Sequence, residues 1–484
     1  MAQPGIQAVL DIQQRLWLAG GYGSQIVLGI DGGGAMTYSS LMIIRRICEA
    51  VDEQEKLLNG SSQQSHGYTP NAHLPSLYFD NCVGSDTGAV AAVMLGRLQM
   101  SSHGSVAAIK DLGEVYCSRL FLHKYCYSNR KLENWALNLI RGNYSNLDEM
   151  DPKDCMMMPA DRVLQIGQCQ TAVLIQHRPK ATNMAPTSSV DAADMIRTYD
   201  VVADRAVHQK PYLPRAIGRK DDDVPILKTL LAAVAVPGHF PPVLIKGTPH
   251  SGVGSKYNNP TSQAFDEGAR LYNMKAGEDR QRNDDKRVGI VVSIGSGKEA
   301  PRDFLRPWDI YRRMLFSGKS TDKKLSEPDK VHNDMKGRLQ AADVPYFRFD
   351  GPDLQKCKYD DWSPRTLAII EKETSFYLAR KSVKLDITLL AQYLVAYRRG
   401  RHITRPEDLF RAPTAQEMDA TGSNPIRNNT WPYAESAPTL ANHIDSPPWR
   451  IERRSQSENH LLRDQQVVRQ LQELPAHYLP PEAP

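Results

Sequence analysis

A glycine-rich turn between an apolar run and a helical pattern places the strongest constraint on how this chain can fold. The apolar run Ile26–Ile30 ends in Asp31-Gly32-Gly33-Gly34. Apolar residues then recur at helical spacing over Tyr38–Leu58, so we expect a strand, a tight turn and a helix in succession. Glycines at such a turn let backbone N–H groups converge on a phosphate or on the oxyanion of a reaction intermediate.

The same order of elements returns before residue 100. Leu77–Val83 has the pattern of a buried strand, and Ala89–Met100 has that of an apolar helix. Between them lies Gly84-Ser85-Asp86-Thr87-Gly88, whose flanking glycines are typical of a nucleophile elbow, the sharp turn that presents a reactive side chain. The residue at the centre of this turn is Asp86. Strands that alternate with helices predict a mainly parallel sheet between two layers of helices.

The chain divides by pattern into four parts. Residues 1–22 predict a lead-in helix, and residues 23–300 predict an α/β domain. Residues 301–400 predict a helical extension of that domain, and residues 401–484, which are rich in proline and contain no lysine, predict a largely disordered tail. The further elements that we expect are strands at Ala172–Gln176, Arg287–Ile294 and Pro345–Phe349, and helices at Val224–Val236, Lys330–Ala342, Ser363–Leu378 and Leu385–Arg398.

Composition and charge exclude several classes of function. The 60 Lys and Arg residues barely exceed the 55 Asp and Glu residues and form no basic block, so we expect no nucleic-acid partner. No apolar run approaches the roughly 18 residues that span a bilayer, and the N-terminus lacks the pattern of a leader peptide. Seven sparse cysteines predict reduced thiols, and no motif predicts a cofactor or a metal site. We therefore expect a cytoplasmic protein.

With both turns in view, the chain resembles the patatin-like phospholipases, and the long fungal members in particular, over about residues 25–400. The resemblance implies a three-layer α/β fold with lipid acyl-hydrolase chemistry and no cofactor. By the family pattern, Gly32, Gly33 and Gly34 would form the oxyanion hole, and Gly84, Ser85 and Gly88 the frame of the elbow. The resemblance rests on the order and spacing of four pieces: Ile30–Gly34 with Tyr38–Leu41, Tyr78–Asp80 leading into Gly84–Gly88 and Met94–Leu98, Gly252–Gly254 with Asn258-Asn259-Pro260, and Val291–Lys298.

The chain departs from the family at the residues that carry the chemistry. Family members attack the ester with an elbow serine, which pairs with an aspartate that precedes a glycine. Here Asp86 replaces the serine and His250 aligns with the aspartate, with Ser251 as the competing match. An Arg-Gly pair after the triple glycine is replaced by Met36-Thr37, and a β-branched residue resists the positive φ open to glycine.

These replacements change what the elbow can do. A carboxylate has no proton to lose as it attacks, and as an anion at a helix N-terminus it opposes a second negative charge beside it. We therefore expect ester hydrolysis by this chain to be absent or very slow.

Three functional interpretations remain. The first is a pseudoenzyme in which Asp86 caps the following helix. Its cleft either binds a lipid or another acyl or hydrophobic small molecule, with peripheral membrane contact allowed, or survives merely as part of the fold in a scaffold protein. The second is an enzyme in which Asp86 attacks an epoxide or alkyl carbon and His250 activates the water that releases the product. The third is residual acyl hydrolysis through Ser85, Thr87 or Ser251. We expect the first, because a fold can persist after its catalytic residues have been replaced. In addition, Ser85 and Thr87 should point away from the apex of the elbow.

Overall fold

The computed structural model describes residues 4–19, 24–61, 74–117, 125–143, 151–158, 169–177, 193–199, 215–217, 223–276, 288–299 and 327–404. Two compact units divide the chain, residues 1–424 and residues 425–484, and every described residue belongs to the first. The tail that the composition predicts lies outside the described residues from residue 405 onward.

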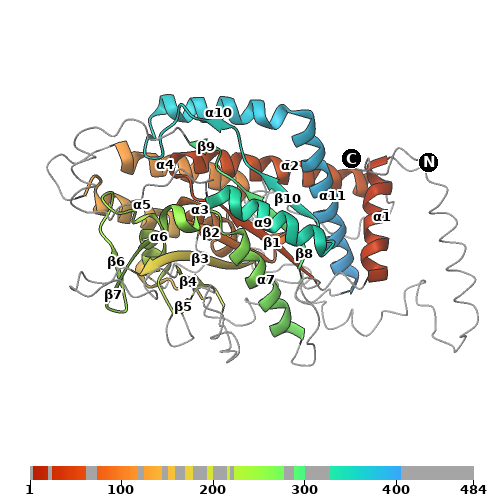
Figure 1. Ribbon diagram of the computed structural model, residues 1–484, viewed down its shortest axis with the longest axis horizontal. Helices are drawn as coiled ribbons and strands as arrows, with labels where there is room; N and C mark the ends of the chain where they lie inside the picture. The colour runs from red at the N-terminus through yellow and green to blue at the C-terminus, as the bar shows by residue number, and fades with distance from the viewer. Residues whose placement is uncertain are drawn as a thin grey trace, which may run out of the picture. The chain divides into compact units, whose positions relative to one another are not determined.

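A nine-stranded mixed sheet forms the centre of the described unit (Figure 1). Its main path runs in the order β10-β8-β1-β2-β3-β4-β5, and β7 pairs with both β3 and β6. Neighbours from β10 to β3 are parallel, whereas β4 and β7 run antiparallel to β3. The strands are β1 (Gln25–Ile30), β2 (Asn81–Ser85), β3 (Gln170–His177), β4 (Ala193–Arg197), β5 (Arg215–Ile217), β6 (Val243–Ile245), β7 (Thr248–Gly252), β8 (Val288–Ile294) and β10 (Tyr346–Phe349).

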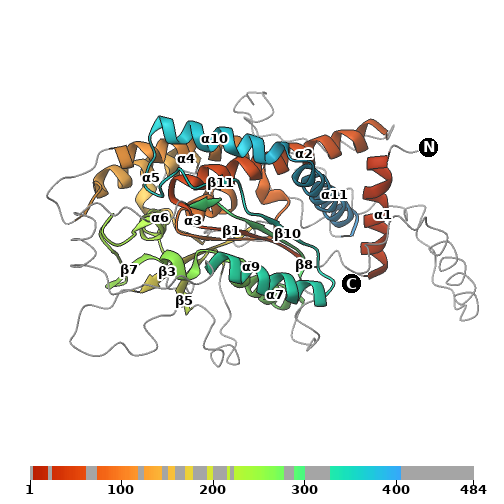
Figure 2. The same cartoon turned by 45° about the horizontal axis from the view of Figure 1, so that its top comes forward.

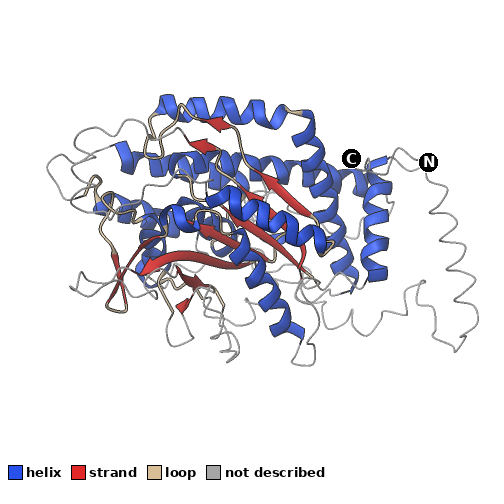
Figure 3. Ribbon diagram, viewed as in Figure 1, coloured by secondary structure: helices blue, strands red, loops and turns tan. Residues whose placement is uncertain are grey.

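Ten α-helices fall within the described residues, and Figure 3 separates them from the strands by colour. They are α1 (Pro4–Ala19), α2 (Thr37–Ser61), α3 (Thr87–Ala92), α4 (Ser102–Cys117), α5 (Asn129–Asn143), α6 (Ile226–Val234), α7 (Thr261–Ala276), α9 (Glu327–Ala341), α10 (Pro364–Ala379) and α11 (Lys381–Thr404). None of the described helices combines the length and apolar character needed to cross a bilayer.

Helices cover both faces of the sheet. In Figure 2, α2, α4 and α10 lie on one side of the strands, and α7 and α9 lie on the other. The side chains of β1 follow this division, because Ile26, Leu28 and Ile30 belong to one core cluster and Val27 belongs to another with Phe265 of α7. Every residue of β1 and β2 is buried, as expected for strands with helices on both faces.

The α/β prediction is confirmed at this level, with shifted boundaries. Each glycine turn lies between a strand and a helix. β2 begins at Asn81, because Pro75–Leu77 forms a 3₁₀ turn that the apolar pattern does not distinguish from a strand. The helix after the elbow ends at Ala92 and continues as a π-helical turn over Val93–Arg97. Strands β4 to β7, which make the sheet mixed, have no counterpart among the predicted elements.

The segment expected as a helical extension also completes the sheet. Its strand β10 pairs in parallel with β8, with Phe347 opposite Val292. The segments that follow β8 and β10 pair with each other again, as the short parallel strands β9 (Lys298–Glu299) and β11 (Asp353–Leu354). The connection from β11 to α10 then carries Tyr359, which reaches the two glycine turns. This part of the chain therefore belongs to the α/β domain and contributes to its candidate site.

Candidate functional site

The turn between β2 and α3 has the backbone conformation of a nucleophile elbow. Asp86 lies at its apex with φ 52° and ψ −128°, a strained conformation for a residue with a side chain. The flanking glycines are required by close approach: a Cβ on Gly84 would lie 2.2 Å from the carbonyl oxygen of Gly88, and a Cβ on Gly88 would lie 2.3 Å from that of Asp31. The two glycine turns are thus in direct contact, and both elbow glycines have the structural role that the sequence predicts.

The carboxylate at the apex is buried and only half satisfied. Asp86 is 3% exposed, and its Oδ2 accepts a hydrogen bond from the hydroxyl of Tyr359. Its Oδ1 is buried and has no hydrogen-bond partner among the described residues. Burial raises the pKa of Asp86 to about 6, while the Tyr359 hydroxyl and the Thr87 amide oppose that rise.

The prediction that Asp86 caps the following helix as a stabilised anion is therefore wrong. No side-chain capping hydrogen bond joins Asp86 to the first turn of α3. The helix end favours the anion, but the loss of hydration in a buried position outweighs it and raises the carboxyl pKa. The hydrogen bond of the carboxylate to a side chain is instead made with Tyr359, from the connection between β11 and α10.

The amides of the triple-glycine turn are already occupied. The N–H groups of Gly33 and Gly34 both donate to Oγ1 of Thr87, at 3.2 and 2.8 Å. Thr87 Oγ1 is also 2.6 Å from Oγ1 of Thr37, which starts α2. Met36-Thr37 stands where the family pattern has Arg-Gly. Thr37 has a helical φ of −59°, so this pair leads directly into α2. The hydroxyl of Thr87 therefore occupies the position in which an oxyanion would have to accept these two hydrogen bonds.

The remaining amides of this turn donate within the chain as well. The N–H of Gly32 lies 3.0 Å from both Oγ of Ser85 and the carbonyl oxygen of Asn258, and the N–H of Ala35 donates to the carbonyl oxygen of Tyr359 at 2.9 Å. Ser85 Oγ in turn donates to the Asn258 carbonyl at 2.5 Å. The amides of Gly32, Gly33 and Gly34, which the family resemblance assigns to an oxyanion hole, thus all donate to partners within the chain.

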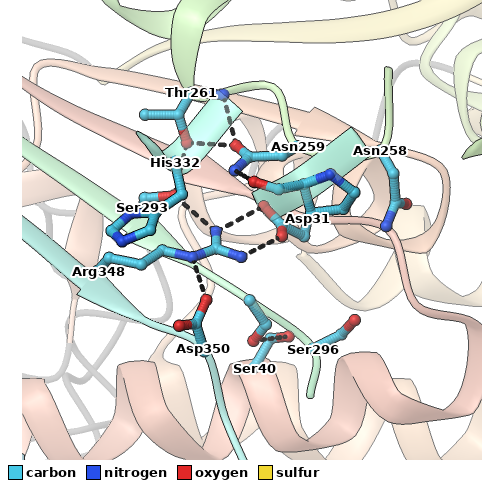
Figure 4. A network of polar contacts seen from close by, with 12 residues as sticks. Asp31, Ser40, Asn258, Asn259, Thr261, Ser293, Ser296, His332, Arg348 and Asp350 are labelled. Carbon is cyan, nitrogen blue, oxygen red and sulfur yellow. Dashed lines mark hydrogen bonds and ion pairs between the residues drawn. The ribbon is translucent and has the colours of Figure 1, made fainter. Parts of the chain in front are cut away.

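A buried ion pair fixes the start of the glycine turn. Arg348 of β10 donates to both carboxylate oxygens of Asp31, at 3.0 and 2.7 Å, and also to Ser293 Oγ and Asp350 Oδ1 (Figure 4). Burial raises the pKa of Asp31, and the bidentate guanidinium opposes that rise. The pair ties the end of β1 to β10 across β8, which holds the turn rigidly at the end of the sheet.

The Asn-Asn-Pro segment is fixed by the same network. Oδ1 of Asn259 accepts hydrogen bonds from the amide and the hydroxyl of Thr261, at 3.0 and 2.5 Å, and Thr261 Oγ1 lies 2.5 Å from Ser293 Oγ (Figure 4). This arrangement begins α7 next to β8 and presents the Asn258 carbonyl to the two turns. The segment therefore has a positioning role at the site.

His250, which the sequence aligns with the dyad aspartate, is directed elsewhere. It lies on β7, where its Nδ1 is 2.9 Å from the carbonyl oxygen of Thr248 and its Nε2 is 3.4 Å from Oδ2 of Asp194 on β4. Among the described residues, no hydrogen bond or ion pair joins His250 to Asp86. Gly252, two residues further along β7, is the part of this strand that approaches the elbow, since a Cβ on it would lie 3.9 Å from Asp86 Oδ1.

The other candidate nucleophiles are also turned away from the apex. Ser85 and Thr87 point into the hydrogen bonds of the glycine turn, as the geometry of an elbow predicts. Ser251 Oγ lies 3.3 Å from the carbonyl oxygen of Gly252. None of the three hydroxyl groups shares a hydrogen bond with Asp86 or with His250 among the described residues.

Sequence reasoning missed the residue that completes the site, Tyr359. It lies in the connection between β11 and α10, where no periodic pattern or turn motif marks it. Its hydroxyl contacts Asp86 and its carbonyl contacts Ala35, so one residue bridges the elbow and the glycine turn. Arg348 was missed for the same reason, since a lone arginine in a short strand carries no signal of a partner 317 residues earlier.

No protein-family model matches the chain, and no curated protein matches it. The described residues contain no group of three or more His, Cys, Asp or Glu side chains that could hold a metal ion. The site thus combines an aspartate at the apex of the elbow with glycine-turn amides that donate to other groups of the chain.

Proposed function

We propose that this chain is a patatin-like pseudoenzyme, which keeps the elbow and the glycine turn of a lipid acyl hydrolase as a binding site and does not hydrolyse esters. The observation that carries the proposal is the pairing of an aspartate at the strained apex with glycine-turn amides that already bond to Thr87. The ligand class that the family resemblance implies is a lipid or another molecule with a hydrophobic chain.

Two independent obstacles stand against acyl transfer at this site. Asp86 is an anion above its pKa of about 6 and offers no proton to a base, so the serine mechanism has no counterpart. An oxyanion formed beside it would lack the donors that normally stabilise it, and removal of one such donor already costs about 10²- to 10³-fold in rate. The two effects act on the same intermediate and reinforce each other.

The second interpretation, alkyl transfer to Asp86, has weaker support. It requires a base that activates water next to the ester on Asp86. His250 lies between an acceptor carbonyl at Nδ1 and the carboxylate of Asp194 at Nε2, so both of its ring nitrogens already face acceptors. No other described histidine shares a hydrogen bond with Asp86. The position of His250 therefore favours a binding protein over an enzyme.

The test is intact-protein mass spectrometry after exposure to an activated ester, p-nitrophenyl butyrate, and to an epoxide, 1,2-epoxyhexane. We expect unchanged masses for the wild-type protein, for His250→Ala and for Asp86→Asn. A butyryl adduct would support the interpretation that the protein catalyses acyl transfer. An alkyl adduct that accumulates in His250→Ala and is missing in Asp86→Asn would establish the alkyl-ester enzyme and overturn the proposal.

A further inference from the structure

Asp86 carries a buried carboxylate oxygen that no described residue satisfies. Oδ1 has no hydrogen-bond donor, and among the described residues no Lys or Arg side chain forms an ion pair with Asp86. The only described side chain that donates to this carboxylate is the neutral Tyr359. A buried carboxylate in this state is costly unless something else supplies a donor or a positive charge.

A series of aromatic rings in contact with one another begins at Tyr359, which bonds to this carboxylate. The ring of Tyr359 lies 6.1 Å from that of His239, His239 lies 5.4 Å from Tyr127, and Tyr127 lies 4.7 Å from Tyr116. The Asp86 charge also contributes to the strongly raised pKa of Tyr116, which places Tyr116 near the carboxylate. We call these four rings, together with Phe240 and Trp362, which pack on Tyr116, the aromatic cluster.

The unsatisfied atom of Asp86 is an acceptor, so the group that would complete it is a hydrogen-bond donor. Buried polar atoms without partners are uncommon in folded proteins, and a bound molecule is one way to satisfy such an atom. Asp86 is 3% exposed, so a donor that reaches Oδ1 would bind in a largely buried position.

The geometry points to an organic ammonium, the head of an alkylamine, as the ligand group that binds at Asp86. This inference rests on the proposed function, in which the elbow is a binding site, and it specifies the chemistry of the ligand's head. An ammonium would donate to Oδ1 and would also be attracted by the face of an adjacent aromatic ring such as that of Tyr359. A carboxylate or phosphate head would be repelled by Asp86, and the amides that could have received it are occupied by Thr87.

The approach to Asp86 runs past two partly exposed rings. Tyr116, Tyr127, Phe240 and Trp362 are at most 6% exposed. Tyr359 and His239, in contrast, are only partly buried. They belong to the β11–α10 connection and to the turn after α6, respectively. A ligand head would therefore reach Oδ1 by displacing or sliding past the side chain of Tyr359.

The experiment is isothermal titration of the full chain with hexylamine, 1-hexanol and hexanoate, which share one chain and differ in the charge of the head. Near neutral pH we expect hexylamine to bind at least about tenfold more tightly than hexanol, and hexanoate to bind most weakly. Asp86→Asn, which keeps the shape and removes the charge, should lose the preference for the amine. Asp111→Asn, on the same helix as Tyr116, is the matched control and should keep it.

Two further arms make the result specific. Hexylamine stays charged at about pH 5, whereas Asp86 becomes protonated below about 6, so the preference should fall there. The other titratable groups near the carboxylate are Tyr359, Tyr116 and His239, with Asp360 bonded to Tyr127. Asp86→Asn is therefore titrated at both pH values, and any change that persists in it belongs to another group. Tyr359→Phe, which removes the internal donor, should bind hexylamine more tightly than the wild type.

Equal affinity for the three compounds, no binding of any of them, or an amine preference that survives in Asp86→Asn would overturn the inference. Each of these results leaves the proposed lack of ester hydrolysis untouched. That claim fails only on observed turnover or a covalent adduct, so the two failures are distinguishable.

Discussion

The hydroxyl of Tyr359 donates a hydrogen bond to the carboxylate of Asp86, although 273 residues separate the two in the chain. The carbonyl of the same tyrosine accepts the N–H of Ala35, at the end of the glycine turn. Tyr359 therefore connects the elbow and the glycine turn through its hydroxyl and its carbonyl group. The contact explains how a strained, buried aspartate is kept in place without a cationic partner among the described residues.

Replacement of Tyr359 by Phe should raise the pKa of Asp86 above its value of about 6. The hydroxyl bonds to the charged carboxylate and stabilises it, so its loss favours the protonated form. The measurement is a pH titration of the aspartate side-chain carbon resonances by NMR, with Asp86→Asn to assign the signal. A pKa that is unchanged or lower in Tyr359→Phe would mean that the hydroxyl does not bond to the anion.

Asp86→Asn should change how stability depends on pH. The pKa of Asp86 is raised from 3.8 to about 6 on folding, so this group favours the folded state most below about pH 4, and that contribution is lost as pH rises through 6. Relative to the wild type, Asp86→Asn should therefore gain up to about 3 kcal/mol in unfolding free energy between about pH 4 and pH 7. Urea unfolding at several pH values tests this, and a pH-independent difference between the two proteins would contradict it.

The local parts of this site follow from the sequence, and the long-range parts do not. The strand, glycine turn and helix around Asp31 and around Asp86 are set by apolar periodicity and by glycine, which act within a few residues. Tyr359 and Arg348 reach the site from distant segments, and single polar residues in short elements carry no local signal of their partners. His250 matches the dyad aspartate only by its position in the sequence pattern. The neighbours that direct its ring, Thr248 and Asp194, lie on or next to strands that the sequence does not predict.

Asp31→Asn should destabilise the fold strongly, because it leaves the buried guanidinium of Arg348 with Asp350 as its remaining carboxylate partner. We expect a loss of about 3 kcal/mol in unfolding free energy, near the lower end of the range for a broken buried pair. The matched control is Glu53→Gln, which removes one of the two carboxylate partners of Arg46 in a partly exposed pair and should cost less than about 1 kcal/mol. Equal effects of the two changes in urea unfolding would show that the Asp31–Arg348 pair is not buried as described.

Introducing the two dyad residues of the patatin-like pattern should not produce activity. In the double variant Asp86→Ser with His250→Asp, the new aspartate would lie beside Asp194 on the sheet, away from the elbow, and Thr87 would still occupy the amides of Gly33 and Gly34. We expect p-nitrophenyl ester turnover at the level of the denatured protein, and a further Thr37→Gly change alone would not free those amides. Substantial turnover in the double variant would show that the amides are accessible and that β7 can deliver the base.

The most direct test of the central claim is the initial rate of p-nitrophenyl butyrate and phospholipid hydrolysis by the purified wild-type protein, compared with Asp86→Asn, Ser85→Ala and a heat-denatured sample. The account predicts the same background rate in all four, because the residue at the apex is an aspartate without a hydroxyl of its own and the glycine-turn amides already donate within the chain. Turnover by the wild type that is lost in Ser85→Ala or in Asp86→Asn would identify a working nucleophile and contradict it.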